Sequence, residues 1–185
     1  MGKAARMTAD DYLALPARPD RRRLELVEGE VAVNEPAWLH NAVQSHLTGA
    51  LWAWAHARAG RGAVGVPLDV RLDEHNVYAP DVVWYSEGRV PARHDPPPYP
   101  LPDLVAEIRS PSTWQLDLGA KKAAYERHGL PELWLLDTAA ETVLAFRRSA
   151  PGGQTFDVTL ELSAGDALGS PLLEGFAVAL DELFA

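Results

Sequence analysis

The chain has 185 residues, 47% of them hydrophobic, which predicts one globular domain spanning residues 1–185. It contains no cysteine, so disulfide bonds and thiolate metal sites are excluded and a metal ion would have oxygen or imidazole ligands. The net charge of −9 argues against a broad non-specific nucleic-acid-binding surface, but basic residues do gather between Arg18 and Arg23. No stretch has the apolar length of a signal peptide or a membrane span, and we expect a cytoplasmic protein.

The first part of the chain predicts a short helix, a hairpin and a long helix. Residues 8–15 begin with a threonine cap followed by acids, which is typical of a helix start. Residues 24–33 alternate around a Glu-Gly turn, as in a β-hairpin. A period of two places Glu25 on the same face as Val27, so this acid points toward an apolar region. Residues 40–58 carry apolar side chains at helical spacing and should form the longest helix.

Most of the remaining segments are short, apolar and bounded by Gly, Pro or Asp, which is typical of strands. We expect strands at residues 64–72, 81–85, 104–108, 133–136, 142–147, 154–162 and 172–178. A helix at residues 117–128 interrupts this series, and residues 89–102 contain six prolines and should form a loop. The order of elements predicts an α+β fold of the α/β/α type, with a central mixed sheet flanked by helices.

Three acids, Glu25, Asp81 and Glu107, each begin or interrupt an apolar strand. A buried carboxylate without a partner costs several kcal/mol or is forced to take up a proton, so each acid needs a cation. Lys121 lies on the helix that follows the third acid. Carboxylates suit Mg²⁺ or Mn²⁺, and a metal with a nearby ammonium group is what phosphodiester hydrolysis requires.

Each of these residues also has a simpler interpretation. Asp81 follows a proline, as turn-forming acids often do. Glu107 could be neutralised by Arg109 or by a distant arginine in a structural ion pair. Asp117 and Lys121 could form an ordinary helix pair, which stabilises by roughly 0.3 kcal/mol. The combined spacing of two acids and a lysine favours a functional site over three separate structural roles.

Two further side chains lie near the predicted site, and two tryptophans bear on assembly. His40 is more readily interpreted as an exposed or internally satisfied histidine than as a site residue. Tyr125 shares a helix face with Lys121 and is expected to pack over the sheet while donating to an acid. The six tryptophans, including Trp52 and Trp54, exceed what a core requires, and we expect a homodimer in which some tryptophans face the partner.

Several motifs together resemble one known family. They are ELVEGE at residues 25–30, His40, PDVV at 80–83, AEIRSPST at 106–113 and DLGAKKAAYERHGLPELWLLD at 117–137. The pattern resembles the bacterial Uma-type restriction endonuclease family, a branch of the restriction-endonuclease-like PD-(D/E)XK nuclease superfamily. The similarity runs over nearly the whole chain.

The resemblance implies a restriction-endonuclease-like core and a DNA endonuclease that depends on Mg²⁺ or Mn²⁺. By the same resemblance, Asp81 and Glu107 are the metal-binding acids and the carbonyl of Ile108 completes the protein ligands. Lys121 corresponds to the catalytic lysine, which assists water or phosphate activation. Glu25 corresponds to an additional acid of the catalytic set.

One position departs from the usual superfamily pattern, which has a lysine two residues after the second acid. Arg109 occupies that place, and an arginine stays charged and cannot act as a base. The role therefore falls to Lys121, with Lys122 as a rival. The alternative to a nuclease is a catalytically inactive descendant that serves as a nucleic-acid-binding or protein-interaction module.

Overall fold

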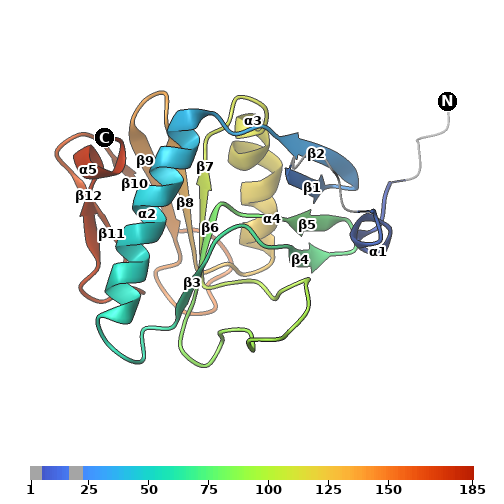
Figure 1. Cartoon of the computed structure of the whole chain (residues 1–185), viewed down its shortest axis with the longest axis horizontal. Helices are drawn as coiled ribbons and strands as arrows, with labels where there is room; N and C mark the ends of the chain where they lie inside the picture. The colour runs from blue at the N-terminus through green and yellow to red at the C-terminus, as the bar shows by residue number, and fades with distance from the viewer. Residues whose placement is uncertain (1–5, 17–22) are drawn as a thin grey trace.

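A six-stranded mixed sheet forms the centre of the protein (Figure 1). The computed structural model describes residues 6–16 and 23–185, so the basic residues between 18 and 22 lie outside the described part. Only β7 and β8 run parallel, and the other neighbours are antiparallel, which confirms the predicted mixed sheet. The strand order is β10 (Val158–Leu162), β9 (Thr142–Arg147), β8 (Glu132–Asp137), β7 (Leu104–Ile108), β6 (Val82–Tyr85) and β3 (Ala63–Gly65).

Two smaller sheets flank the central one. The larger of them contains the predicted hairpin, in which Leu26 lies opposite Val31. Its order is β2 (Glu30–Asn34), β1 (Arg23–Val27), β5 (Asn76–Tyr78) and β4 (Val70–Asp73), and the helix α1 (Ala9–Leu13) packs against it. The other is the pair β11 (Ala167–Gly169) and β12 (Ala177–Ala179).

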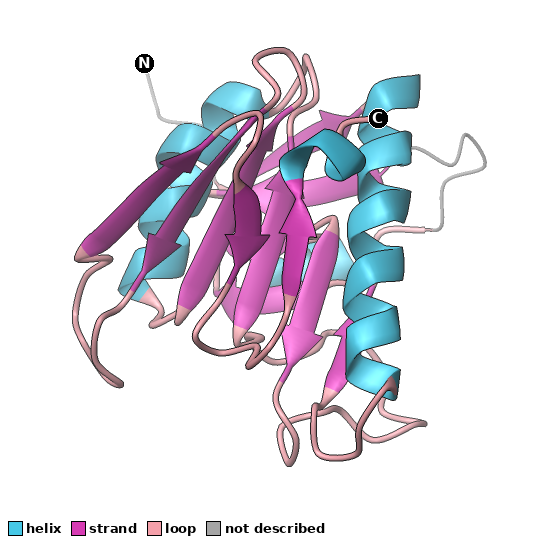
Figure 2. Ribbon diagram, turned by 90° about the vertical axis from the view of Figure 1, so that its left-hand side faces the viewer, coloured by secondary structure: helices cyan, strands magenta, loops and turns pink. Residues whose placement is uncertain are grey.

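Helices cover both faces of the central sheet (Figure 2), which confirms the α/β/α arrangement. On one face lie α2 (Trp38–His56) and α5 (Leu180–Leu183). On the other lies a continuous helical segment made of α3 (Trp114–Leu116), the π-helical turn η1 (Asp117–Lys121) and α4 (Lys122–Arg127). None of the helices in residues 6–16 and 23–185 is long and apolar enough to cross a membrane.

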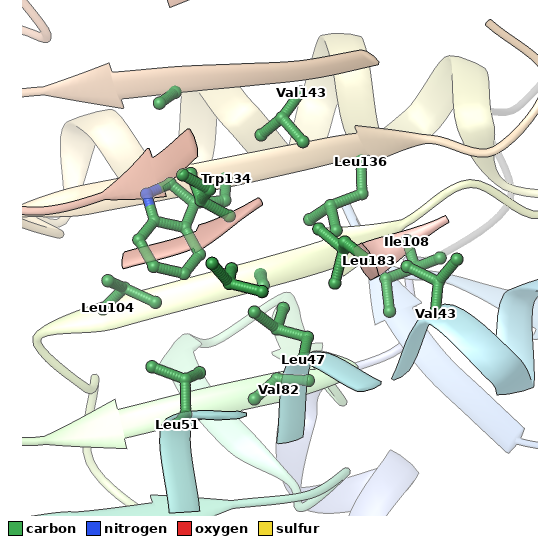
Figure 3. Packing of buried hydrophobic residues seen from close by; sticks show 14 of the residues in the cluster. Val43, Leu47, Leu51, Val82, Leu104, Ile108, Trp134, Leu136, Val143 and Leu183 are labelled. Carbon is green, nitrogen blue, oxygen red and sulfur yellow. The ribbon is translucent and has the colours of Figure 1, made fainter. Parts of the chain in front are cut away.

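Strict alternation along β7 sends its side chains to two different cores. Leu104 and Ile108 point toward α2, where they pack with Leu47 in the larger hydrophobic cluster (Figure 3). Val105 lies in the cluster on the α4 side. Because successive strand residues face opposite sides, Glu107 is directed to the α4 face along with Val105.

The structure differs from the sequence prediction in several places, and it also contains the strands β5 and β11, which the pattern did not predict. The strand expected at residues 64–72 is divided into β3 and β4, which belong to different sheets, because Pro67 between them cannot donate to a ladder. The helix expected at 117–128 starts at Trp114 and includes a π-helical turn. The last two expected strands are shorter than predicted, with β10 starting at Val158 and β12 at Ala177.

Candidate active site

Lys121 lies at the centre of a buried group of carboxylates. Its Nζ atom is 2.9 Å from Oε1 of Glu25, 2.8 Å from Oε1 of Glu107 and 3.0 Å from Oδ1 of Asp117. The lysine side chain is 2% exposed, and the three acids are equally buried. The structure therefore brings together three of the four predicted catalytic residues and adds Asp117.

Local geometry explains why these side chains converge. Glu25 shares the face of β1 with Val27, as the period of two predicted, and both point toward the helical segment. Glu107 reaches the same space from β7 because it alternates with apolar neighbours. The π-helical turn contains both Asp117 and Lys121, and such turns occur frequently at functional sites.

The electrostatic balance of this group is unusual for a protein interior. Burial alone would lower the pKa of Lys121, but attraction to Asp117, Glu107 and Glu25 outweighs it, and the pKa lies above its ordinary value. The lysine is therefore charged. Burial raises the pKa of Glu107 well above its usual range, which Lys121 opposes and the neighbouring acids reinforce.

Asp117 has one oxygen without a hydrogen bond. Its Oδ2 accepts from the hydroxyl of Thr113 at 3.2 Å. Its Oδ1 is buried and lies near the ammonium of Lys121 without meeting hydrogen-bond geometry, so only charge attraction compensates it. Burial raises the pKa of this carboxyl as well. The sequence offered the i,i+4 spacing of Asp117 and Lys121 but no indication that the pair is buried.

Tyr125 completes the wall around Glu107. Its hydroxyl donates to Oε1 of Glu107 at 2.7 Å, which agrees with the expectation that it bonds an acid. Its ring meets the ring of Tyr78 edge to face, with 5.3 Å between centroids. Both tyrosines are fully buried, so Glu107 sits at the border between the acidic group and an apolar core.

Asp81, the fourth predicted residue, lies directly before β6 and forms hydrogen bonds with residues of three other elements. Its Oδ1 is 3.1 Å from Nε2 of His40 and accepts from Arg23 at 3.2 Å, while its backbone carbonyl accepts from Gln44 at 2.7 Å. Its Oδ2 accepts from the backbone N–H of Ile108 at 2.8 Å. Asp81 therefore links α2, β1 and the end of β7.

His40 belongs to the site, which the sequence interpretation missed. The side chain is buried, and its Nδ1 lies 3.4 Å from the carbonyl of Arg109. Both ring nitrogens face oxygens, which favours the doubly protonated ring. Burial lowers the pKa of His40, but the hydrogen bond and charge of Asp81 together with the carbonyl of Arg109 outweigh it, and the pKa is raised. The sequence did place His40 and Gln44 one helical turn apart, so the two residues that contact Asp81 could have been expected on the same face of the helix.

The backbone of Ile108 does not pair with β6 because of a proline. Val82 lies opposite Ala106, so continuing this register puts Ile108 opposite Pro80, which has no N–H to donate. The N–H of Ile108 instead binds Asp81. Since the N–H and C=O of one strand residue point to the same side, the carbonyl also faces the Asp81 edge.

The two rival basic residues lie elsewhere. Arg109 donates to both oxygens of Asp137 at 2.8 Å and lies over the ring of Trp114. The ion pair between Arg109 and Glu107 that the sequence left open is therefore wrong. Lys122 places its Nζ 4.6 Å from the ring centroid of Phe146, away from the acids. Lys121 is the lysine that contacts two of the predicted acids, Glu25 and Glu107.

The donor set is compatible with a divalent cation. Residues 6–16 and 23–185 contain no cluster of three His, Asp or Glu side chains arranged around a common metal position. Mg²⁺, however, usually takes one or two carboxylates and completes its octahedron with other oxygens, including water. The carboxylates of Asp81 and Glu107 with the carbonyl of Ile108 are a set of this kind.

Comparison with known proteins agrees with this fold. The family model described as "Putative restriction endonuclease" (Uma2) matches residues 9–181. No curated protein matches the chain. A crystal structure described as "a putative nuclease belonging to DUF820", from Anabaena variabilis ATCC 29413, is similar with a TM-score of 0.79 and 20% identity, covering 96% of this chain and 97% of that one. The fold is restriction-endonuclease-like, as expected, and the chain belongs to the Uma2 family.

Proposed function

We propose that this protein is a divalent-metal-dependent endonuclease that hydrolyses phosphodiester bonds in DNA. The observation that carries the proposal is the convergence of four buried carboxyl groups, those of Glu25, Asp81, Glu107 and Asp117, at one place. Burial and the neighbouring acids raise the pKa of Glu107 and Asp117, so the four groups resist being ionised together without a further cation. Uncompensated buried charge is strongly unfavourable, so a bound cation would relieve the site.

Asp81, Glu107 and the carbonyl of Ile108 would hold a Mg²⁺ or Mn²⁺ ion. When bound, the cation supplies Lewis-acid stabilisation of charge on phosphate oxygens and makes water more acidic. His40 and Arg23 hold the Asp81 carboxylate in place, and Tyr125 does the same for Glu107. Because these supports come from different elements, the two carboxylates are fixed before any ligand arrives, which is the preorganisation that catalysis needs.

Lys121 acts in this proposal as a positive charge rather than as a base, because its raised pKa keeps the proton on it. In hydrolysis, a water oxygen attacks phosphorus, the bond from phosphorus to the leaving sugar oxygen breaks, and that oxygen takes up a proton. The ammonium group stabilises the charge that grows on the phosphate. Glu25 positions it, since both oxygens accept from Lys121 and Oε1 also accepts from the N–H of Ala79.

The second candidate is a catalytically inactive binding module. It is favoured by the hydrogen bonds from Arg23 and Tyr125 that the oxygens of Asp81 and Glu107 already accept. We also propose a homodimer, because two symmetric copies present two active sites to a duplex with two strands.

Metal binding separates the two candidates. Mg²⁺ or Mn²⁺ at about a hundred times its dissociation constant should raise the free energy of unfolding by about 2.7 kcal/mol, because only the folded state binds it. Asp81→Asn should remove that gain. Asp137→Asn, which changes an acid paired with Arg109 outside the group, should retain it. Thermal melting of the three proteins with and without metal measures this, and a wild type that melts identically in both conditions would eliminate the metal site.

A further inference from the structure

A groove runs along α2 and reaches Arg23 and Gln44, two residues that form hydrogen bonds with Asp81. It encloses about 610 Å³, and Arg23 and Gln44 line the end that lies at the candidate active site. Arg23 donates to the carboxylate of Asp81 and Gln44 to its backbone carbonyl, so the groove is continuous with the residues that hold this acid. Trp52 and Val66 line the other end. Residues 44 and 52 are eight apart, which gives the groove a length of about 12 Å along the helix.

The end away from Asp81 is apolar and open. Trp52 is 55% exposed and Val66 is 53% exposed. His56 stacks on the Trp52 ring at 4.0 Å between centroids and so holds the indole in place. Between the two ends lies Gly49, where a Cβ atom would meet nothing within 4 Å. The groove thus combines a cation at the active-site end, an unobstructed floor and an exposed aromatic surface.

The charges along the groove fit a nucleic-acid strand but not a whole duplex. The 19-residue helix α2 contains no Asp or Glu, although the chain has 26 acidic residues, so phosphates approaching α2 meet no carboxylate from it. Duplex binding normally depends on many phosphate contacts with lysine and arginine. Among the residues that the structure describes, Arg23 is the one lysine or arginine lining this groove, whereas an exposed tryptophan offers stacking to an unpaired base.

We propose that this groove binds an unpaired nucleotide next to the phosphate that is cleaved, with its base against Trp52 and its phosphate toward Arg23. The inference rests on the proposed nuclease function and assigns its substrate class, which is single-stranded or locally unpaired DNA. Stacking on an aromatic ring is tolerant of base identity, so the groove selects for strand state rather than for sequence.

The test compares binding of a fluorescent single-stranded oligodeoxynucleotide with that of a hairpin duplex by anisotropy, with Ca²⁺ replacing Mg²⁺. Trp52→Ala removes the stacking surface, and Gly49→Leu fills the floor at a helix position that favours leucine over glycine. Both should weaken single-strand binding about tenfold. Trp38→Ala is the matched control, since Trp38 is 87% exposed on the same helix and does not line the groove. It should change affinity by less than about twofold.

Equal single-strand affinity in the wild type and in both groove variants would overturn the inference. If the groove is instead a contact between two copies of the chain, the groove variants should show a lower molecular mass than the wild type by light scattering. Their single-strand affinity per protomer should then be unchanged, and this outcome also overturns the inference. Binding is measured apart from cleavage. A wild type that cleaves nothing but shows the predicted affinity pattern would support the groove while removing the hydrolytic function.

Discussion

Replacing Lys121 by methionine is expected to lower the free energy of unfolding by about 3–5 kcal/mol at mildly alkaline pH. The ammonium group is the shared partner of Glu25, Glu107 and Asp117, and methionine fills its volume without its charge. Three carboxylates would then lie buried side by side with no ion to balance them. Urea denaturation of the wild type and the variant at two pH values measures the effect.

The loss should shrink as the pH falls. Glu107 and Asp117 have pKa values raised by burial in the folded protein, so the folded state binds protons more tightly than the unfolded state. Stability linked to such groups rises as the pH drops toward the unfolded pKa, because the acids become neutral. The variant should therefore recover part of its stability at mildly acidic pH. Adding Asp117→Asn to Lys121→Met should give a similar recovery at alkaline pH.

The adjacent lysine provides the control for this prediction. Lys122 makes cation–π contacts with Phe146 and Phe156 and lies away from the acids, so Lys122→Met should cost about 1 kcal/mol and show no such pH dependence. If Lys121→Met unfolds at the same denaturant concentration as the wild type at both pH values, the charge balance described for this group is wrong.

Glu107→Gln is expected to lower the rate of metal-dependent DNA cleavage about a thousandfold, equivalent to about 4 kcal/mol of transition-state stabilisation. Glutamine keeps the shape of the side chain but removes the charge that would bind the cation. The fold should survive, because the pKa of Glu107 is already raised and a neutral group suits this surrounding. The variant should melt at or above the wild-type temperature in the absence of metal.

Rates of plasmid nicking measure the loss, and melting curves show that it is not due to unfolding. Glu30→Gln, an exposed acid on β2, is the matched control and should cleave at the wild-type rate. A Glu107→Gln protein that retains most of the wild-type rate would remove Glu107 from the proposed metal site.

Strand alternation alone determines the direction of the Glu25 and Glu107 side chains, and both residues were predicted from the sequence. The period of two put Glu25 on the Val27 face, and the same rule directs Glu107 away from α2. Alternation therefore explains why both acids point toward the helical segment, although the sequence pattern had indicated a direction only for Glu25. Asp81 was found through its place at the head of a strand, after a proline that ends the ladder.

The roles of His40 and Asp117, and the burial of Lys121, could not be predicted because they depend on contacts distant in the chain. His40 and Asp81 are 41 residues apart, and the helical pattern around His40 is equally compatible with a core position. Asp117 and Lys121 have the spacing of an exposed helix pair, and only the packing of the π-helical turn against β1 and β7 buries them. The division of residues 64–72 between two sheets was missed because its strand alternation continues across Pro67.

The central claim is tested most directly by incubating supercoiled plasmid DNA with the purified wild-type protein in the presence of Mg²⁺, Mn²⁺ or EDTA. Each reaction is run beside Asp81→Asn, which changes one ligand charge but leaves Lys121 and its acids intact. The account predicts nicked or linear DNA with either metal, none with EDTA, and none with the variant. Cleavage that continues at the same rate in the Asp81→Asn protein, or a folded wild type that cleaves with neither metal, would contradict it.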